Sequence, residues 1–174
     1  GGSAATGSWS ITSVTGSMTN ASGQLSSTSL TATPATVTFT PISGNSGTVT
    51  LTLTTNDPSG PCGTVSDVVV LTVNPSISGN TSGSAVSICN NTSTTLTGGT
   101  VSDGLGSYTY LWESSTTSAV AGFATASGTS NGQNYTPGTI SSTTWYRRTV
   151  TSGGCTNTAT AIQMTIMPVP SASA

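Results

Sequence analysis

One sequence unit occurs twice in this chain, and the duplication limits the possible folds more than any other feature. Cys62 is followed by three alternating apolar residues and a proline: Val69, Leu71, Val73 and Pro75. Cys155 is followed at the same offsets by a matching set: Ile162, Met164, Ile166 and Pro168. Apolar residues at every second position are typical of a half-buried β-strand. Each copy is therefore predicted to end in a strand whose inner face is formed by these residues.

The same alternation recurs along the whole chain, for example at 37–40, 49–53, 108–112 and 162–166, and clusters of Gly, Ser, Asn and Pro separate the runs. No stretch has helical periodicity, so the chain is predicted to be all-β. We expect two tandem immunoglobulin-like sandwiches of antiparallel strands, at 1–75 and 76–168. Pro75 should end the first, since proline cannot extend a strand ladder. Residues 169–174 are interpreted as a linker into a following repeat.

The first copy is predicted to lack its opening strands. Gly1-Gly2 followed by Trp9 resembles Gly98-Gly99 followed by Trp112. The second copy carries strand signals at 86–88 and 94–96 ahead of its Gly-Gly pair, and the first copy has no counterpart to them. We expect its opening strands to come from residues before Gly1 or from another chain.

The surface is predicted to be nearly uncharged. Only 3% of residues are charged and the formal net charge is −2, while Ser and Thr make up roughly 40% of the chain and should occupy the exposed positions. The only basic residues are Arg147 and Arg148. Nucleic acid and anionic membranes are therefore poor partners, and no apolar run is long enough for membrane insertion. A disordered linker is the alternative reading of such a composition, but the alternating apolar residues argue against it.

The three cysteines predict one complete disulfide and half of another. Cys89 and Cys155 lie in the second copy and are expected to be joined, which would place the protein in an oxidising, extracellular compartment. Cys62 corresponds to Cys155, so its partner is expected outside the segment; a free thiol at Cys62 is the alternative. A zinc site is not predicted, because the chain has no His and no closely spaced Cys pair.

The inventory of reactive groups argues against an enzyme. The chain has no His and no Lys, and its four acids are scattered: Asp57, Asp67, Asp103 and Glu113. They predict neither a catalytic constellation nor a cofactor or metal site, since Ca²⁺ needs several oxygen ligands close together. The best binding hypothesis is a glycan contact at Trp145 and Arg147, on one strand. The structural alternative is that a neighbouring loop covers Trp145, or that Trp145 makes a cation–π contact with Arg147.

Two groups of residues resemble a known type of repeat. The stretch 51–62 followed by Val65-Ser66-Asp67-Val68, and the stretches 108–113, 144–148 and 152–155, are similar to the PKD-like and Ig-like repeats of very large Bacteroidota surface proteins. Such proteins include gliding-motility adhesins exported by the type IX secretion system. The resemblance implies an extracellular, disulfide-bonded, filamentous or stalk-like role, and it implies no catalytic residues.

Two functions follow as expectations. The first is a structural or adhesive repeat of an extracellular surface filament or giant adhesin, a rigid spacer whose partners are neighbouring repeats or neighbouring protomers. The second is a glycan-binding accessory module of a secreted enzyme, with a surface polysaccharide as its partner.

Overall fold

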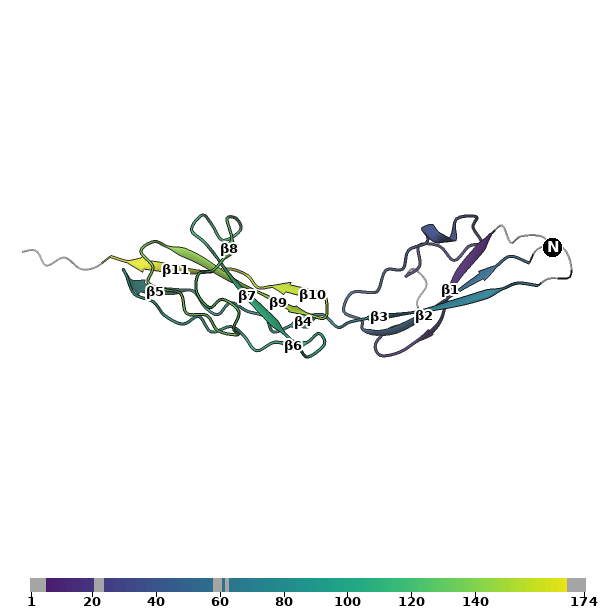
Figure 1. Cartoon of the computed structure of the whole chain (residues 1–174), viewed down its shortest axis with the longest axis horizontal. Coiled ribbons are helices and arrows are strands. Elements are labelled where there is room, and N and C mark those ends of the chain that lie inside the picture. The colour runs from purple at the N-terminus through teal and green to yellow at the C-terminus, as the bar shows by residue number, and fades with distance from the viewer. Residues whose placement is uncertain (1–5, 21–23, 58–60, 62, 169–174) are drawn as a thin grey trace, which may run out of the picture. The chain divides into compact units, whose positions relative to one another are not determined.

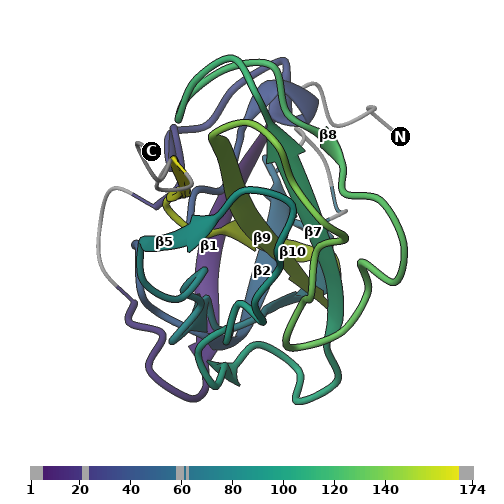
Figure 2. The ribbon, with the colours of Figure 1, turned by 90° about the vertical axis from the view of Figure 1, so that its left-hand side faces the viewer.

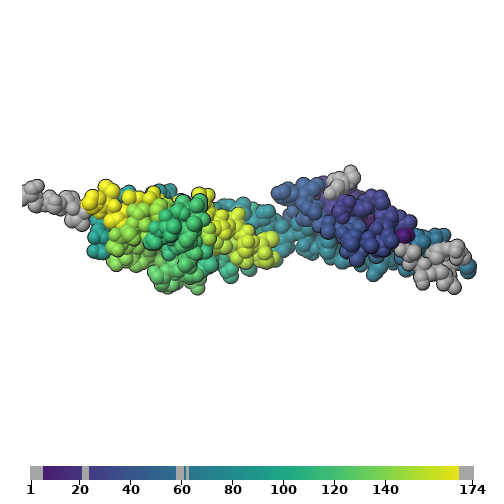
Figure 3. Space-filling view, turned by 90° about the horizontal axis from the view of Figure 1, so that it is seen from above, coloured from purple at the N-terminus to yellow at the C-terminus, as the bar shows by residue number. Residues whose placement is uncertain are grey.

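The computed structural model describes residues 6–20, 24–57, 61 and 63–168, and these form β-strands, turns and extended segments (Figure 1). The prediction of an all-β chain is confirmed. The chain divides into two compact units, Gly1–Pro75 (unit 1) and Ser76–Ala174 (unit 2). Each unit is built from one continuous stretch of the chain, and Figure 3 draws the chain in space-filling form, coloured by residue number. In the described residues, no helix has the length and apolar character needed to cross a membrane.

Unit 1 contains one antiparallel sheet of three strands in the order β1 (Gly7–Val14), β2 (Gly47–Thr55) and β3 (Ser66–Val73). Its inner face follows from the alternation of apolar residues in β2, where Val49 and Leu51 are buried. The register shifts between Ile11 and Ser13 in β1. This bulge adds one residue to β1, so that Ile11 and Val14 both pack against the core although three positions separate them.

The segment between β1 and β2 covers the inner face of the unit 1 sheet. It contains a short 3-10 turn, η1 (Pro34–Thr36), and a bridge between Leu25 and Phe39. The indole Nε1 of Trp9 donates a 2.9 Å hydrogen bond to the carbonyl oxygen of Pro34, which ties this segment to β1. The buried residues of the unit 1 core are Met18, Leu25, Val49 and Leu51.

Unit 2 contains a larger sheet and a small two-stranded one. The larger sheet has the order β5 (Val86–Cys89), β11 (Ile162–Met167), β9 (Thr144–Ser152), β7 (Thr109–Ser115) and β8 (Ala124–Thr125), and β10 (Cys155–Thr158) also pairs with β9. The small sheet pairs β4 (Ile77–Ser78) with β6 (Ser102–Asp103). Figure 2 shows β9 and β7 side by side. The expectation of antiparallel strands throughout is wrong at one pair, because β5 runs parallel to β11.

The core of unit 2 is aromatic. Trp112 is fully buried, and its ring stacks on that of Tyr135 with 5.7 Å between centroids. The ring centroid of Tyr146 also lies 5.7 Å from that of Tyr135, and the two rings are tilted by 45°. The indole Nε1 of Trp112 donates a 3.0 Å hydrogen bond to the carbonyl oxygen of Gly132. The buried cluster comprises Leu96, Trp112, Ala126, Tyr135, Tyr146 and Met164.

Strand pairing places the two copies of the repeat in equivalent positions. Val69 of β3 lies opposite Leu51, and its counterpart Ile162 of β11 lies opposite Tyr146. Two residues further along the central strands, Leu53 lies opposite Trp9 and Arg148 lies opposite Trp112. The two tryptophans, aligned on sequence by their Gly-Gly pairs, thus occupy the same site relative to the closing strand. Each also donates its indole N–H to a backbone carbonyl in the following segment.

The expected disulfide between Cys89 and Cys155 is absent, and both are free thiols. Cys155 lies level with Ser152 at one end of β9, whereas Cys89 lies opposite Met167, beyond the other end of that strand. At about 3.3 Å per residue the length of β9 alone separates the cysteines by roughly 25 Å, far beyond the span of a disulfide. The labels of β5 and β10 stand at opposite ends of unit 2 in Figure 1. Cys62 lies outside the described residues.

Candidate functional site

The acidic groups do not converge on one site. In the part of the chain that the structure describes, no three His, Cys, Asp or Glu side chains lie close enough together to hold a metal ion. The Asp67 carboxylate accepts the backbone N–H of Val68 at 2.8 Å. Asp103 accepts the hydroxyls of Ser78 and Ser102 at the β4–β6 pair. Both carboxylates thus bond to local groups.

The residues proposed for glycan contact lie on the outer face of β9. Trp145 and Arg147 are both partly exposed. The Nε of Arg147 donates a 2.9 Å hydrogen bond to the Glu113 carboxylate, and its guanidinium carbon lies 4.1 Å above the ring of Phe123. The guanidinium of Arg147 is therefore engaged by two neighbours, and its aromatic partner is Phe123 instead of the Trp145 of the structural alternative. The glycan contact stays a prediction.

Arg148, the adjacent residue, is fully buried in unit 2. Its guanidinium donates to three neutral oxygens: Asn80 Oδ1 at 2.9 Å, the Gln133 carbonyl at 2.7 Å and the Gly99 carbonyl at 2.6 Å. Its backbone N–H donates to the Ser82 hydroxyl at 3.1 Å. These partners come from three separate segments of unit 2. Arg148 therefore connects β9 to residues 80–82, to Gly99 and to Gln133.

The Gly98-Gly99 pair makes room for this arrangement. A Cβ atom at Gly98 would overlap Nη1 of Arg148 and the Gln133 carbonyl oxygen, and one at Gly99 would lie 2.5 Å from the Gly79 carbonyl oxygen. Burial lowers the pKa of the Arg148 guanidinium from its ordinary value, because the charged form loses solvation. The three carbonyl-type acceptors compensate part of that loss.

Sequence reasoning missed the buried Arg148 and treated it only as one of two basic residues. A signal was present, because β9 alternates strictly between buried and partly exposed residues. Tyr146 and Val150 point into the core, so Arg148 between them must do the same.

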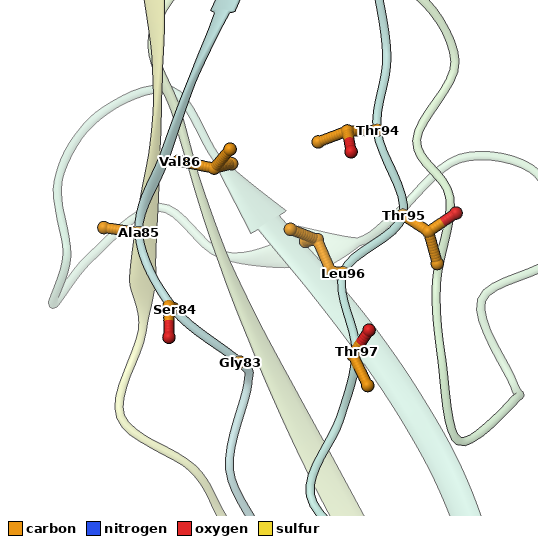
Figure 4. Close-up of a pocket in the computed structure, with 8 residues that line it drawn as sticks. All are labelled: Gly83, Ser84, Ala85, Val86, Thr94, Thr95, Leu96 and Thr97. Carbon is orange, nitrogen blue, oxygen red and sulfur yellow. The ribbon is translucent and has the colours of Figure 1, made fainter.

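A depression of about 350 Å³ lies between residues 83–86 and 94–97 of unit 2 (Figure 4). Val86 and Leu96 point toward one another across it, while Ala85 points away. The lining carries only methyl groups, threonine and serine hydroxyls, and backbone. It offers no charged group for recognition of a ligand.

The outer edge of β3 in unit 1 is exposed. In the described part of the chain, β3 pairs with β2 and with no other strand. The exposed apolar residues here are Val68, Val69 and Val70 in β3 and Val65 just before it. An uncovered apolar strand edge of this kind is uncommon, because it is a template for pairing with another chain.

Comparison with known proteins identifies a family. No curated protein matches the chain in sequence. The model of a family described as "Domain of unknown function (DUF8696)" matches residues 77–168, more than half of the chain and nearly all of unit 2. The chain therefore belongs to the DUF8696 family.

Proposed function

We propose that the chain is a structural or adhesive repeat segment of an extracellular surface filament or giant adhesin, in which each unit acts as a rigid spacer. The proposal includes export to the cell surface, as in the type IX-secreted gliding-motility adhesins of Bacteroidota that the sequence resembles. Its partners are neighbouring repeats of the same array or neighbouring protomers of a filament.

The observation that carries the proposal is the repetition of one β-structure within the chain. Trp9 opposite Leu53 and Trp112 opposite Arg148 occupy equivalent positions in the two units, and each unit has its own buried core. Units that fold around separate cores and follow one another along a chain are the building blocks of extended repeat proteins.

The exposed hydroxyls support a role outside the cell. Across the outer faces of the sheets they bond to each other in pairs, with Oγ–Oγ distances between 2.7 and 3.0 Å: Thr12 with Thr52, Thr15 with Thr48, Thr54 with Ser66, and Thr149 with Thr158. Such a surface is hydrated and internally bonded without ionised groups. Its stability should therefore depend little on salt, because screening acts on charges.

The buried Arg148 supports the rigidity that a spacer requires. Because its guanidinium joins three segments of unit 2, none of them can move without breaking a charge-assisted hydrogen bond. Without the expected disulfide, this network and the aromatic core hold unit 2 together.

The proposal is tested by locating the protein on intact cells. Antibodies raised against residues 76–168 should label material outside the cell when whole cells are examined by immunogold electron microscopy, and the label should lie along extended fibres. Protease added to intact cells should remove it. Labelling only after the cells are permeabilised would contradict the proposal.

A binding assay separates the second expected function from the first. A glycan-binding module should retain surface polysaccharides on an array, and Trp145→Ala should abolish that retention. A spacer should show no retention that depends on Trp145. The contacts of the neighbouring Arg147 with Glu113 and Phe123 agree with this second outcome, because they leave its guanidinium less available for a glycan.

A further inference from the structure

We propose that the outer edge of β3 is a docking site for an extended strand of the β5 type, supplied by another repeat of the same family and bound parallel to β3. Here "β5 type" means a segment with the apolar–polar–apolar pattern of Val86-Ser87-Ile88. This inference goes beyond the proposed function, since it rests on the pairing of strands and not on the location of the protein.

The equivalence of the two units identifies the site. Leu71 and Val73 of β3 correspond to Met164 and Ile166 of β11. In unit 2 these two residues lie opposite Val86 and Ile88 of β5, in a parallel pair. In unit 1 the corresponding edge has no strand on it in the described residues.

Side chains at this edge of unit 1 are more exposed than their counterparts in unit 2. Met164 is 0% exposed in unit 2, whereas its counterpart Leu71 is only partly buried. Val69 is 39% exposed, whereas its counterpart Ile162 packs against the core. The bridge of Leu25 to Phe39 in unit 1 provides cover like that of Leu96 to Tyr135 in unit 2. No described residue of unit 1 takes the place of β5.

The backbone of β3 is oriented to accept a strand. The carbonyl oxygen of Val65 accepts the backbone N–H of Thr55 from β2. In an antiparallel ladder every second residue bonds to the same neighbouring strand, so every second residue counted from Val65 bonds to β2. The N–H and C=O groups of Val70 and Thr72 therefore point to the outer edge. Asp67 occupies the N–H of Val68 near the start of the strand. The second half of β3, where β11 binds β5 in unit 2, carries no such carboxylate.

The required occupant follows from this register. Its first and third residues would lie beside Leu71 and Val73 and face the core, so both must be apolar. Its second residue would face outward and can be polar. The pattern is that of β5, in which Val86 and Ile88 pack against the core of unit 2. A charge at either inward position would be buried without a partner and should prevent docking.

The test uses the whole chain and a labelled peptide with the sequence of residues 84–91, in which Ser replaces Cys89 to avoid disulfide exchange. Binding is measured by fluorescence anisotropy, and its position by chemical-shift changes in ¹⁵N-labelled protein. We expect saturable binding with shifts at residues 70–74. A peptide with Asp at the positions of Val86 and Ile88 should not bind.

Two variants of the chain test the backbone contact. Thr72→Pro removes an N–H that points to the outer edge and leaves the β2 side of the ladder intact, so binding should weaken by about tenfold or more. Thr72→Val keeps the N–H and should bind like the original. Circular dichroism establishes that both variants are folded.

A fusion covers the case in which a short peptide binds too weakly to detect. Residues 76–97 are duplicated ahead of Gly1, with Val86→Asp/Ile88→Asp in the duplicate as the matched control. The intact duplicate should raise the melting temperature of unit 1 and protect the amides of residues 70–74 from exchange. If neither peptide nor fusion engages β3, or if β3 instead pairs with β3 of a second copy in a dimer abolished by Thr72→Pro, the proposal is wrong.

Discussion

The guanidinium of Arg148 donates a 2.6 Å hydrogen bond to the carbonyl oxygen of Gly99, and this contact joins the central strand of unit 2 to the opening segment of the same unit. The equivalent position in unit 1 is Leu53, whose side chain has no hydrogen-bond donor. The two units therefore differ at this position, where Arg148 is fully buried and Leu53 is partly buried.

Replacement of Arg148 by Leu should destabilise unit 2 by about 3 kcal/mol or more, because it leaves the oxygens of Asn80, Gly99 and Gln133 without donors. Urea unfolding followed by tryptophan fluorescence measures the change. Arg147→Leu is the matched control and should cost about 1 kcal/mol or less, since its ion pair with Glu113 is partly exposed. Equal losses in the two variants would contradict the assigned role of Arg148.

Gly98→Ala should also destabilise unit 2, by about 1–3 kcal/mol, because the added methyl group overlaps the Arg148 guanidinium and the Gln133 carbonyl. Gly138→Ala is the control, since a Cβ there meets nothing within 4 Å. Thermal unfolding of the two variants should differ clearly. A melting temperature for Gly98→Ala as high as that of Gly138→Ala would show that the space beside Arg148 is not restricted.

Unit 2 should lose stability in alkali through Tyr146. Burial raises the pKa of Tyr146 to about 12 from its ordinary value of 10.0. The folded state therefore favours the neutral phenol. The stabilisation is complete below pH 10 and is lost as the pH rises from 10 to about 12, by about 2–3 kcal/mol in total.

The Tyr146→Phe variant tests this assignment by urea unfolding at a series of pH values. It cannot ionise at this position, so its stability should fall less steeply between pH 10 and 12. A slope identical to that of the original chain would assign the alkaline loss to other groups.

Asp67→Ala should increase self-association of the chain. The Asp67 carboxylate bonds the outward N–H of Val68 and places a charge on an apolar strand edge, a common defence against edge-to-edge pairing. Light scattering and thioflavin T fluorescence measure the effect. Asp57→Ala changes the net charge by the same amount and should stay monomeric, so aggregation of both variants would point to net charge instead of the strand edge.

The cysteines should be dispensable for the stability of unit 2. In a Cys62→Ser background, two thiols should titrate with Ellman's reagent in the unfolded chain without reductant. The further double variant Cys89→Ser/Cys155→Ser should change the free energy of unfolding by less than about 1 kcal/mol. A loss of about 4 kcal/mol is what a disulfide closing a loop of this length would contribute. Such a loss would show that Cys89 and Cys155 are joined.

Much of the fold was accessible from local pattern. The alternation in the Cys62 and Cys155 copies predicted β3 and β11, and the Gly-Gly pairs aligned Trp9 with Trp112 correctly. The disulfide prediction failed because membership of one repeat does not imply proximity, and Cys89 and Cys155 lie at opposite ends of β9. The parallel pairing of β5 was also out of reach, since alternation gives the face of a residue but not the direction of its neighbour.

By itself the sequence determined that this chain is all-β, duplicated and almost free of charge, because period-two alternation and composition are local properties. Only the tertiary structure decided which segment covers each sheet edge. In unit 2 it placed β5 on β11 and buried Arg148 among three neutral oxygens, while in unit 1 the outer edge of β3 pairs with no strand among the residues that the structure describes. These outcomes depend on contacts between residues far apart in the chain, which the pattern of either segment alone does not specify.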